Sequence, residues 1–118
     1  MTSLIKCCEE FVTQICYGDF YYTGGVLVSP QSLLECSSVT GSIYVQNNPT
    51  ITDIDNLGYI HSIGKSLYII NNENLVDLQG LRYVSYIGES IIIAKNPQLT
   101  STAGLKGNYL INDFVISA

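Results

Sequence analysis

The chain has 118 residues, of which 47% are hydrophobic and 13% charged, and its formal net charge is −5. This composition predicts one folded domain with a substantial core and excludes a disordered chain. The five basic residues are scattered, so no basic patch for a nucleic acid is predicted. Its apolar runs are only a few residues long, far short of the ~20 that span a bilayer, so we expect no direct membrane insertion of this segment.

The N-terminal segment, residues 3–16, has the apolar spacing of an amphipathic helix. Its apolar residues are Leu4, Ile5, Cys8, Phe11, Val12 and Ile15. We expect this helix to lie across the first turn as a terminal cap. Because Lys6, Glu9 and Glu10 occur in the same segment, no signal peptide is visible in this chain.

Residues 18–25, which include Tyr21 and Tyr22, are predicted to form a loop, and residues 26–28 a short strand. Ser29-Pro30 is typical of a helix start and predicts a brief helix over residues 31–35. These elements belong to an atypical first turn. We therefore divide the single domain, residues 1–118, into a cap with its atypical turn (1–40) and regular repeats (41–118).

All four cysteines lie in the first third of the chain: Cys7, Cys8, Cys16 and Cys36. Their position favours a covalent staple at the irregular N-terminal end. Zinc is disfavoured because two of them are adjacent, no CxxC motif occurs and the only histidine is remote. The state of Cys7 and Cys8 stays open.

From residue 43 the sequence follows a 24-residue period, which is marked by Asn48, Asn72 and Asn96. Strand-like triplets begin at Ile43, Leu67 and Ile91. Further apolar columns are Ile51, Leu75 and Leu99; Leu57, Leu81 and Leu105; and Ile63, Ile87 and Ile111. A fixed period of this length predicts a solenoid, in which each turn buries its apolar side by stacking on its neighbours.

Alternation within the triplets predicts that one set of side chains points inward. This set is Ile43 and Val45, Leu67 and Ile69, and Ile91 and Ile93. No run within a turn is long enough for a standard helix, so we predict a mainly β protein, a parallel β-helix with turns ~4.8 Å apart. Val115-Ile116 aligns with Ile91-Ile92 and begins a fourth strand, and from this we expect the chain to be part of a larger protein.

The asparagine column is interpreted as structural. At a tight corner the backbone groups need partners, and an inward asparagine side chain both donates and accepts hydrogen bonds. Stacked amides also bond along the axis, so Asn48, Asn72 and Asn96 are predicted to form a ladder that Asn47 and Asn71 extend.

Gly41, Gly64 and Gly88 precede the strands and are expected to permit a bend or a close approach. Gly41 lies two residues before its strand and the other two lie three before theirs. This difference indicates a one-residue deletion in the first regular turn.

The segment CSSVTGSIYVQNN, which begins at Cys36, resembles the receptor L-domain, the ligand-binding module of the insulin and epidermal growth factor receptors and of some fungal surface proteins. The family pattern of Cys followed by V-x-G-x-(I/L)-x-(I/V) matches Cys36, Val39, Gly41, Ile43 and Val45. The recurring family pattern I-x-G-x-L-x-I is matched from Ile63-Gly64 to Ile69 and from Ile87-Gly88 to Ile93, with one extra residue in each. The resemblance covers roughly residues 16–117.

The resemblance implies a short right-handed β-helix, an N-terminal disulfide between Cys16 and Cys36, and a place on the cell surface or outside the cell. The leucine-rich repeat is the second interpretation. Its motif needs Leu two residues after Asn, whereas Leu75 and Leu99 come three after Asn72 and Asn96.

Catalysis has little support in the sequence. His61 is the only histidine and aligns with Ser85 and Tyr109, an ordinary surface position. Asp53 and Asp77 are the only aligned carboxylates, which is too little for a calcium loop or for a β-helix hydrolase or lyase with paired acids. We therefore expect no enzyme, no metal and no cofactor.

The outward positions of the strands form the candidate partner-binding surface: Tyr44, Gln46, Tyr68, Ile70, Ile92 and Ala94. Five of the six are apolar or aromatic, whereas a solvated face is expected to be polar, and such patches often bind partners. The competing interpretations are that tyrosine stacking stabilises the sheet by itself, or that the N-terminal segment folds over this face. Tyr59 and Tyr83 form a further aromatic column. The sequence thus favours a non-enzymatic protein-recognition module, with a structural or adhesive spacer as the alternative.

Overall fold

The computed structural model describes residues 14–28, 36–105 and 113–116. These residues form a β-solenoid of about three regular turns without any α-helix, which confirms the predicted mainly β solenoid. The strands are β1 Ile15–Cys16, β2 Phe20–Thr23, β3 Val26–Val28, β4 Ser38–Val39, β5 Ile43–Gln46, β6 Ser62–Ile63, β7 Leu67–Ile70, β8 Tyr86–Ile87, β9 Ser90–Ala94 and β10 Asp113–Ile116. Two 3-10 helices occur, η1 Asp55–Leu57 and η2 Gln79–Leu81.

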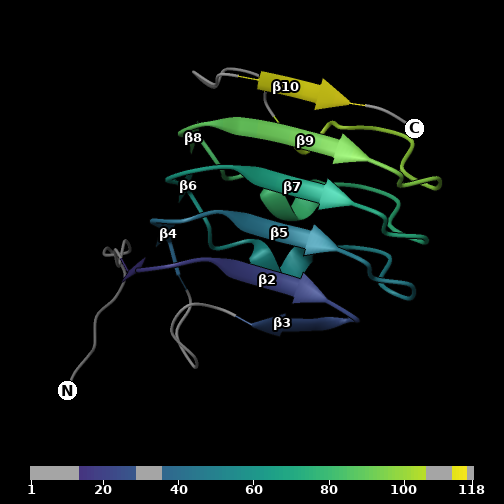
Figure 1. The fold of residues 1–118 in the computed structure, drawn as a ribbon, viewed down its shortest axis with the longest axis horizontal. Coiled ribbons are helices and arrows are strands. Elements are labelled where there is room, and N and C mark those ends of the chain that lie inside the picture. Colours follow the sequence, from purple (N-terminus) through teal and green to yellow (C-terminus); the bar gives the residue numbers. More distant parts are fainter. Residues whose placement is uncertain (1–13, 29–35, 106–112, 117–118) are drawn as a thin grey trace, which may run out of the picture.

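The broad side of the solenoid is a six-stranded sheet in the order β10-β9-β7-β5-β2-β3 (Figure 1). All its neighbours are parallel except β3, which turns back and pairs antiparallel with β2. Ile43 lies opposite Leu67, and Leu67 opposite Ile91, so the 24-residue period of the sequence is the step from one strand to the next.

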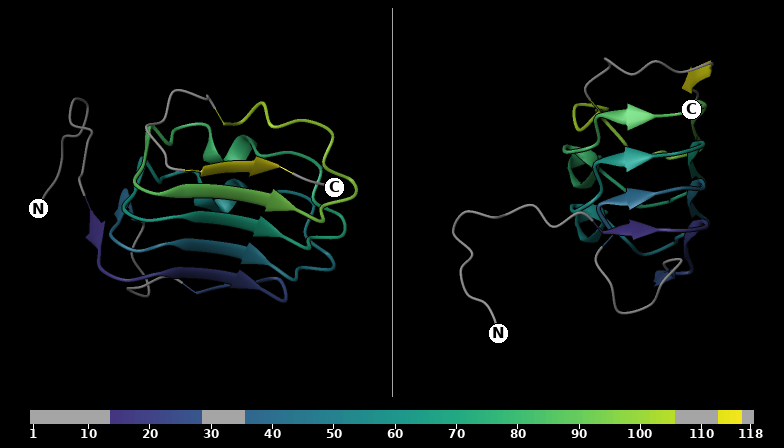
Figure 2. Two further views of the ribbon diagram at one scale, coloured as in Figure 1. Left: turned by 45° about the horizontal axis from the view of Figure 1, so that its top comes forward. Right: turned by 90° about the vertical axis from the view of Figure 1, so that its left-hand side faces the viewer.

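The second side is a narrower sheet of two-residue strands in the order β1-β4-β6-β8. In the right panel of Figure 2 these strands face the viewer, and they are stacked in the same order as the turns of the broad sheet. Val39, Ile63 and Ile87 occupy one buried column across β4, β6 and β8. The apolar residue that ends each turn therefore contributes to the same core as the long strands.

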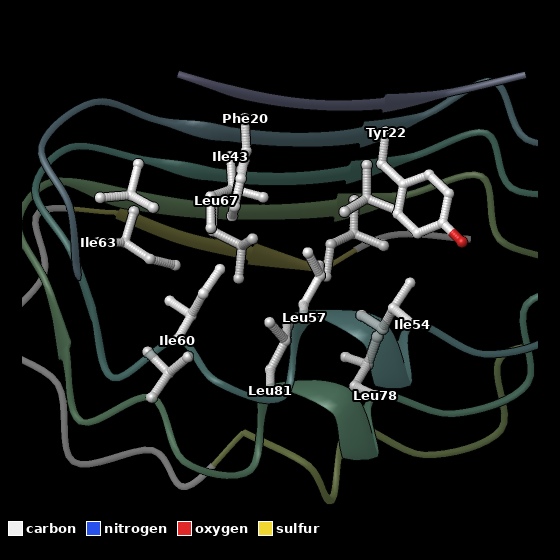
Figure 3. Close-up of a cluster of buried hydrophobic side chains, with 14 of the residues drawn as sticks. Phe20, Tyr22, Ile43, Ile54, Leu57, Ile60, Ile63, Leu67, Leu78 and Leu81 are labelled. Atoms are coloured by element: carbon white, nitrogen blue, oxygen red, sulfur yellow. The ribbon is translucent and has the colours of Figure 1, made fainter. Parts of the chain in front are cut away.

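The core lies between the inner face of the six-stranded sheet and the segments that contain η1 and η2 (Figure 3). Phe20, Ile43 and Leu67 point inward from the sheet, and Leu57 and Leu81 point toward them from the two short helices. Full burial of one such side chain contributes roughly 1.5–3 kcal/mol. This packing holds the six-stranded sheet in place from behind.

The first turn differs from its prediction. Residues 18–25 were expected to be a loop, but Phe20–Thr23 is a strand whose buried Phe20 and Tyr22 alternate with exposed Tyr21 and Thr23. The expectation was wrong because Phe20 pairs with Ile43, and this step along the chain is shorter by a single residue than the regular step from Ile43 to Leu67. The six-stranded sheet consequently extends one turn further than the regular repeats.

Three other expectations concern the N-terminal cap and the atypical first turn. The predicted helix over 3–16 is wrong at its end, because Ile15–Cys16 is a strand that pairs in parallel with Ser38–Val39. The remainder of that helix and the one predicted over 31–35 lie outside the described residues. The strand predicted over residues 26–28 is confirmed.

The last strand is also displaced from its predicted register. Phe114 pairs with Ile91 and Val115 with Ile92, so the final step is again shorter than the regular one by a single residue. The predicted pairing of Val115 with Ile91 is therefore wrong by one position. In the described part of the chain, no helix has the length and apolar character needed to span a membrane.

Candidate functional site on the outer face of the sheet

Three tyrosines form a continuous stack on the outer face of the six-stranded sheet. The ring centroids of Tyr21 and Tyr44 are 5.0 Å apart with an interplanar angle of 5°, and those of Tyr44 and Tyr68 are 4.8 Å apart at 7°. Because neighbouring parallel strands are ~4.8 Å apart, in-register tyrosines stack ring on ring without distortion. The stack presents ring edges and phenol groups to the surroundings.

Apolar residues continue the tyrosine row in both directions. Ile92 lies beside Tyr68 on β9, and Val28 lies beside Tyr21 on β3. Directly paired residues of neighbouring strands project to the same face, so these five residues form one row. A second row on the same face consists of Val26, Thr23, Gln46, Ile70 and Ala94.

We call the ten residues of these two rows the tyrosine face. None of the ten carries a charge. Tyr21, Val26 and Val28 are 46%, 61% and 54% exposed, while Tyr44, Tyr68, Ile70 and Ile92 are half-buried. The described part of this face is therefore a largely apolar, uncharged side of a chain whose net charge is −5.

All six residues of the predicted partner-binding surface lie on the tyrosine face, in the two rows that their alternation implied. Sequence reasoning missed Tyr21, Thr23, Val26 and Val28. Their signal was the pair Tyr21-Tyr22, which precedes Tyr44-Val45 by almost a full period, but the one-residue offset from that period concealed it. The partner role of the face stays a prediction.

The asparagine column lies at the ends of the same strands, inside the solenoid. The Asn48 Nδ2 donates to Asn72 Oδ1 at 2.8 Å, and Asn72 Nδ2 donates to Asn96 Oδ1 at 2.9 Å. Each Nδ2 also donates to a carbonyl of the preceding turn, that of Tyr22, Val45 or Ile69. The amides are buried, so these bonds satisfy groups that water does not reach.

The left-handed corner conformation belongs to the residue before each ladder asparagine. Asn47, Asn71 and Lys95 have φ of 57°, 59° and 59°. Asparagine tolerates this region better than most residues, and Asn71 Nδ2 donates to Asn47 Oδ1 at 2.8 Å. The third corner has lysine at this position, so the hydrogen bond between Asn47 and Asn71 is not repeated there.

A serine ladder at the beginning of the strands was not predicted. The Ser66 N–H donates to Ser42 Oγ at 3.1 Å, and the Ser90 N–H donates to Ser66 Oγ at 3.2 Å. In the first turn Asp19 replaces serine, because its Oδ1 accepts from the Ser42 N–H at 2.7 Å. The signal was present in the sequence as serine at 42, 66 and 90. Both ends of each long strand are thus tied to the next turn by side chains.

Gly64 and Gly88 belong to a column with Thr40, since a Cβ on either glycine would collide with the carbonyl of the residue one turn below. Gly41 lies one column further and approaches the carbonyl of Gly18. The inferred one-residue deletion is therefore wrong, because Thr40 occupies the glycine position of that turn. The N–H of Lys65 donates to the Gly41 carbonyl, which confirms this alignment.

A disulfide joins Cys16 to Cys36, the pairing that the resemblance implied, with 5.7 Å between the Cα atoms. Both cysteines are buried beneath the first turn. The bond connects β1 to the segment that leads into β4, at the end of the solenoid where the asparagine ladder stops.

The aligned carboxylates serve the backbone of the turns. Asp53 Oδ1 accepts from the Asp55 N–H, and Asp77 Oδ1 accepts from the Gln79 N–H, each at 3.0 Å. In the third turn Ser101 Oγ accepts from the Ala103 N–H in the same way. The column therefore has one structural task in all three turns. Among the described residues, no group of three or more His, Cys, Asp or Glu side chains is placed to hold a metal ion.

The second aromatic column lies on another side of the solenoid. Tyr59 and Tyr83 follow η1 and η2 and are 56% and 53% exposed. The ring of His61 lies 6.1 Å from that of Tyr83, and the Arg82 guanidinium lies 4.9 Å from the centroid of the same ring. Tyr83, His61 and Arg82 thus form an exposed cluster separate from the tyrosine face.

The phenol of Tyr21 lies beside the carboxylate of Asp19. Burial raises the pKa of its hydroxyl above the ordinary value, and the Asp19 carboxylate, to which it donates at 3.3 Å, raises the pKa further. The Tyr21 hydroxyl consequently keeps its proton at physiological pH, which agrees with the uncharged character of the face at this position.

These features define the class of the molecule as a β-solenoid with one flat, uncharged aromatic side and side-chain ladders at both ends of its strands. A scan against protein-family models, a search of curated proteins and a search of solved structures each found no match to the chain.

Proposed function

We propose that the chain is a receptor L-domain-like solenoid that acts as a non-enzymatic recognition module of a cell-surface or secreted protein. The partner is a protein that binds the tyrosine face. The observation that carries the proposal is the uncharged stack of Tyr21, Tyr44 and Tyr68 on a sheet fixed from behind by the core. Tyrosine-rich apolar patches of this kind are enriched at protein interfaces.

The order of the tyrosine face favours binding. Each ring is already restrained by its neighbours, so docking a partner costs less side-chain entropy than it would with free tyrosines. Gln46 and Thr23 add polar groups to the second row, which supply directional contacts beside the apolar ones.

The Cys16–Cys36 disulfide is consistent with an oxidising compartment, since such bonds persist mainly outside the cytosol. It supports the extracellular or cell-surface location that the resemblance implies.

The alternative is a structural or adhesive spacer. The observation that favours it is the continuity of the side-chain ladders, because asparagines and serines tie one turn to the next along the whole regular region. A spacer needs this rigidity but does not need the tyrosine face.

Binding of a cell-surface partner by matched variants tests the proposal. The partner is cross-linked to the domain on native cells, identified, and its affinity is then measured with purified components. Tyr44→Ser/Tyr68→Ser is expected to weaken binding by about 100-fold or more, since two central tyrosines are removed. Tyr59→Ser/Tyr83→Ser removes two exposed tyrosines elsewhere and is expected to change it less than about threefold. Equal affinity of the two double variants would contradict recognition through the tyrosine face.

A further inference from the structure

Charged residues flank the tyrosine face at the ends of its strands. Asp19 precedes β2 and accepts a hydrogen bond from the Tyr21 hydroxyl, and Lys65 lies one turn from Glu89 in the same column. Glu89 immediately precedes β9, and Lys95 immediately follows it. Both are exposed. The strand between them contributes Ile92 at its centre, so β9 has a negative start, an apolar middle and a positive end.

A second copy of the solenoid presents the same spacing and the same distribution of charge. Two sheets pack face to face with their strands within about 30° of one another, and side chains from the two faces interdigitate. Rows that repeat at the same ~4.8 Å step stay matched along their whole length. A partner with another repeat loses this match after a few strands.

A two-fold axis parallel to the stacking direction, over the row of Tyr44, Tyr68 and Ile92, places each strand opposite its own counterpart in the antiparallel sense. The start of β9 in one copy then lies near the end of β9 in the other. Glu89 approaches Lys95 of the second copy, and the same pair forms twice. The uncharged row of Tyr44, Tyr68 and Ile92 meets its counterpart at the centre of the contact.

The size of the face sets the strength of the contact. The five strands that carry the two rows span about 19 Å, and the two rows and their flanks span roughly 13 Å, so the face covers on the order of 250 Å² per copy before side-chain relief. Stable complexes bury about 1,200–2,000 Å² in total, so the contact belongs among the weak and transient ones. Such contacts become effective when many copies are held on opposing surfaces.

We propose that two copies of this solenoid associate face to face through their tyrosine faces, as a weak homophilic contact with paired Glu89 and Lys95 at its rim. The proposal rests on the proposed function, because it identifies the protein partner of that same face as a second copy of the chain.

Opposite charges at one central position test the self-association. Tyr68→Lys and Tyr68→Glu are measured by sedimentation velocity from about 10 µM to about 1 mM, the range in which weak contacts populate. Each variant alone is expected to associate at least about tenfold more weakly than the wild type. An equimolar mixture is expected to recover most of the loss, because each lysine then faces a glutamate.

Tyr59→Lys and Tyr59→Glu are the matched controls, since Tyr59 is exposed on another side of the solenoid. They are expected to associate like the wild type. Circular dichroism and thermal melting establish that all four variants are folded, so a loss of association is assigned to the contact.

The rim pair tests the antiparallel arrangement. Glu89→Lys and Lys95→Glu are each expected to weaken association roughly threefold, and the double charge swap is expected to restore it. Wild type that stays monomeric over the whole range, or a mixture of the Tyr68 variants that stays as weak as either alone, overturns the second copy as partner. If Tyr44→Ser/Tyr68→Ser still abolishes binding of a different protein, the proposed function survives that result; if it does not, both fail.

Discussion

Two of the side-chain ladders that join the strands of this solenoid differ in their surroundings, since one lies inside and one outside. The inner ladder of Asn48, Asn72 and Asn96 is buried and hydrogen-bonded at every step. The outer ladder of Tyr21, Tyr44 and Tyr68 touches only through stacked rings and is partly open to solvent. Both arise from the same repeat, but the asparagines satisfy buried hydrogen-bonding groups, whereas the tyrosines stack at the surface.

The difference lies in what the loss of one member leaves behind. Removal of a buried amide takes a hydrogen bond from several polar groups that water does not reach, which is costly. Removal of an exposed ring leaves a solvated gap. A strict period in the sequence therefore does not tell whether a repeated residue stabilises the fold or is available to bind a partner. The burial and the chemistry of the repeated side chain make that distinction.

The largest expected effect is that of Asn72→Ala. The change removes the acceptor of Asn48 Nδ2 and the donors to the Val45 carbonyl and Asn96 Oδ1. We expect the free energy of unfolding to fall by about 3–5 kcal/mol, since each orphaned buried group costs about 1–3 kcal/mol. Urea unfolding followed by circular dichroism measures the loss.

Asn74→Ala is the control for this substitution. Asn74 also donates across turns, to the Pro49 carbonyl at 2.7 Å, but it is exposed. Water replaces that bond, so a loss below about 1 kcal/mol is expected. A similar cost for both substitutions would remove the distinction between the inner ladder and ordinary surface hydrogen bonds.

A smaller effect is expected in the outer ladder. Tyr44→Ala and Tyr68→Ala are each expected to destabilise the fold by about 1 kcal/mol, and a double-mutant cycle is expected to give a coupling of roughly 0.5–1.5 kcal/mol from the stacked pair. The same cycle on Tyr59 and Tyr83, which are not stacked on each other, is expected to give none. Zero coupling between Tyr44 and Tyr68 would show that their stacking does not stabilise the sheet.

The smallest effect concerns alkaline pH. Because burial and Asp19 raise the pKa of Tyr21 in the folded state, the unfolded chain loses this proton first as the pH rises. The contribution of Tyr21 is complete below its unfolded pKa of about 10 and is lost as the pH rises through the folded value. Stability curves of the wild type and Tyr21→Phe are expected to converge or cross over that interval. Parallel curves would mean that the phenol is not perturbed by folding.

The regular turns were predictable because a single 24-residue period governs the strand pairing, the buried columns and the asparagine positions together. Ile43, Leu67 and Ile91 are paired and buried as their alternation required. The six residues of the candidate surface were found by the same alternation, since inward and outward positions are fixed once the strands are known.

The end turns were not predictable in this way, because both shorten the regular step by a single residue. That shift hid the strand Phe20–Thr23 and with it Tyr21, and it displaced the register of β10. The spacing of residues in the sequence also did not reveal the roles of Asp53 and Asp77. A carboxylate that accepts from the backbone two residues later is recognised only when the turn geometry is known.

The ladders also decide how this protein can change in length. The bonds between Asn48 and Asn72, between Ser42 and Ser66, and between Ser38 and Ser62 all join residues 24 apart. An insertion of a few residues within a turn shifts some of these columns against the others and breaks bonds at several corners at once. An insertion of one whole turn preserves every column and adds one more rung to each. Duplication of complete turns is therefore the route by which this architecture can grow without passing through an unstable intermediate.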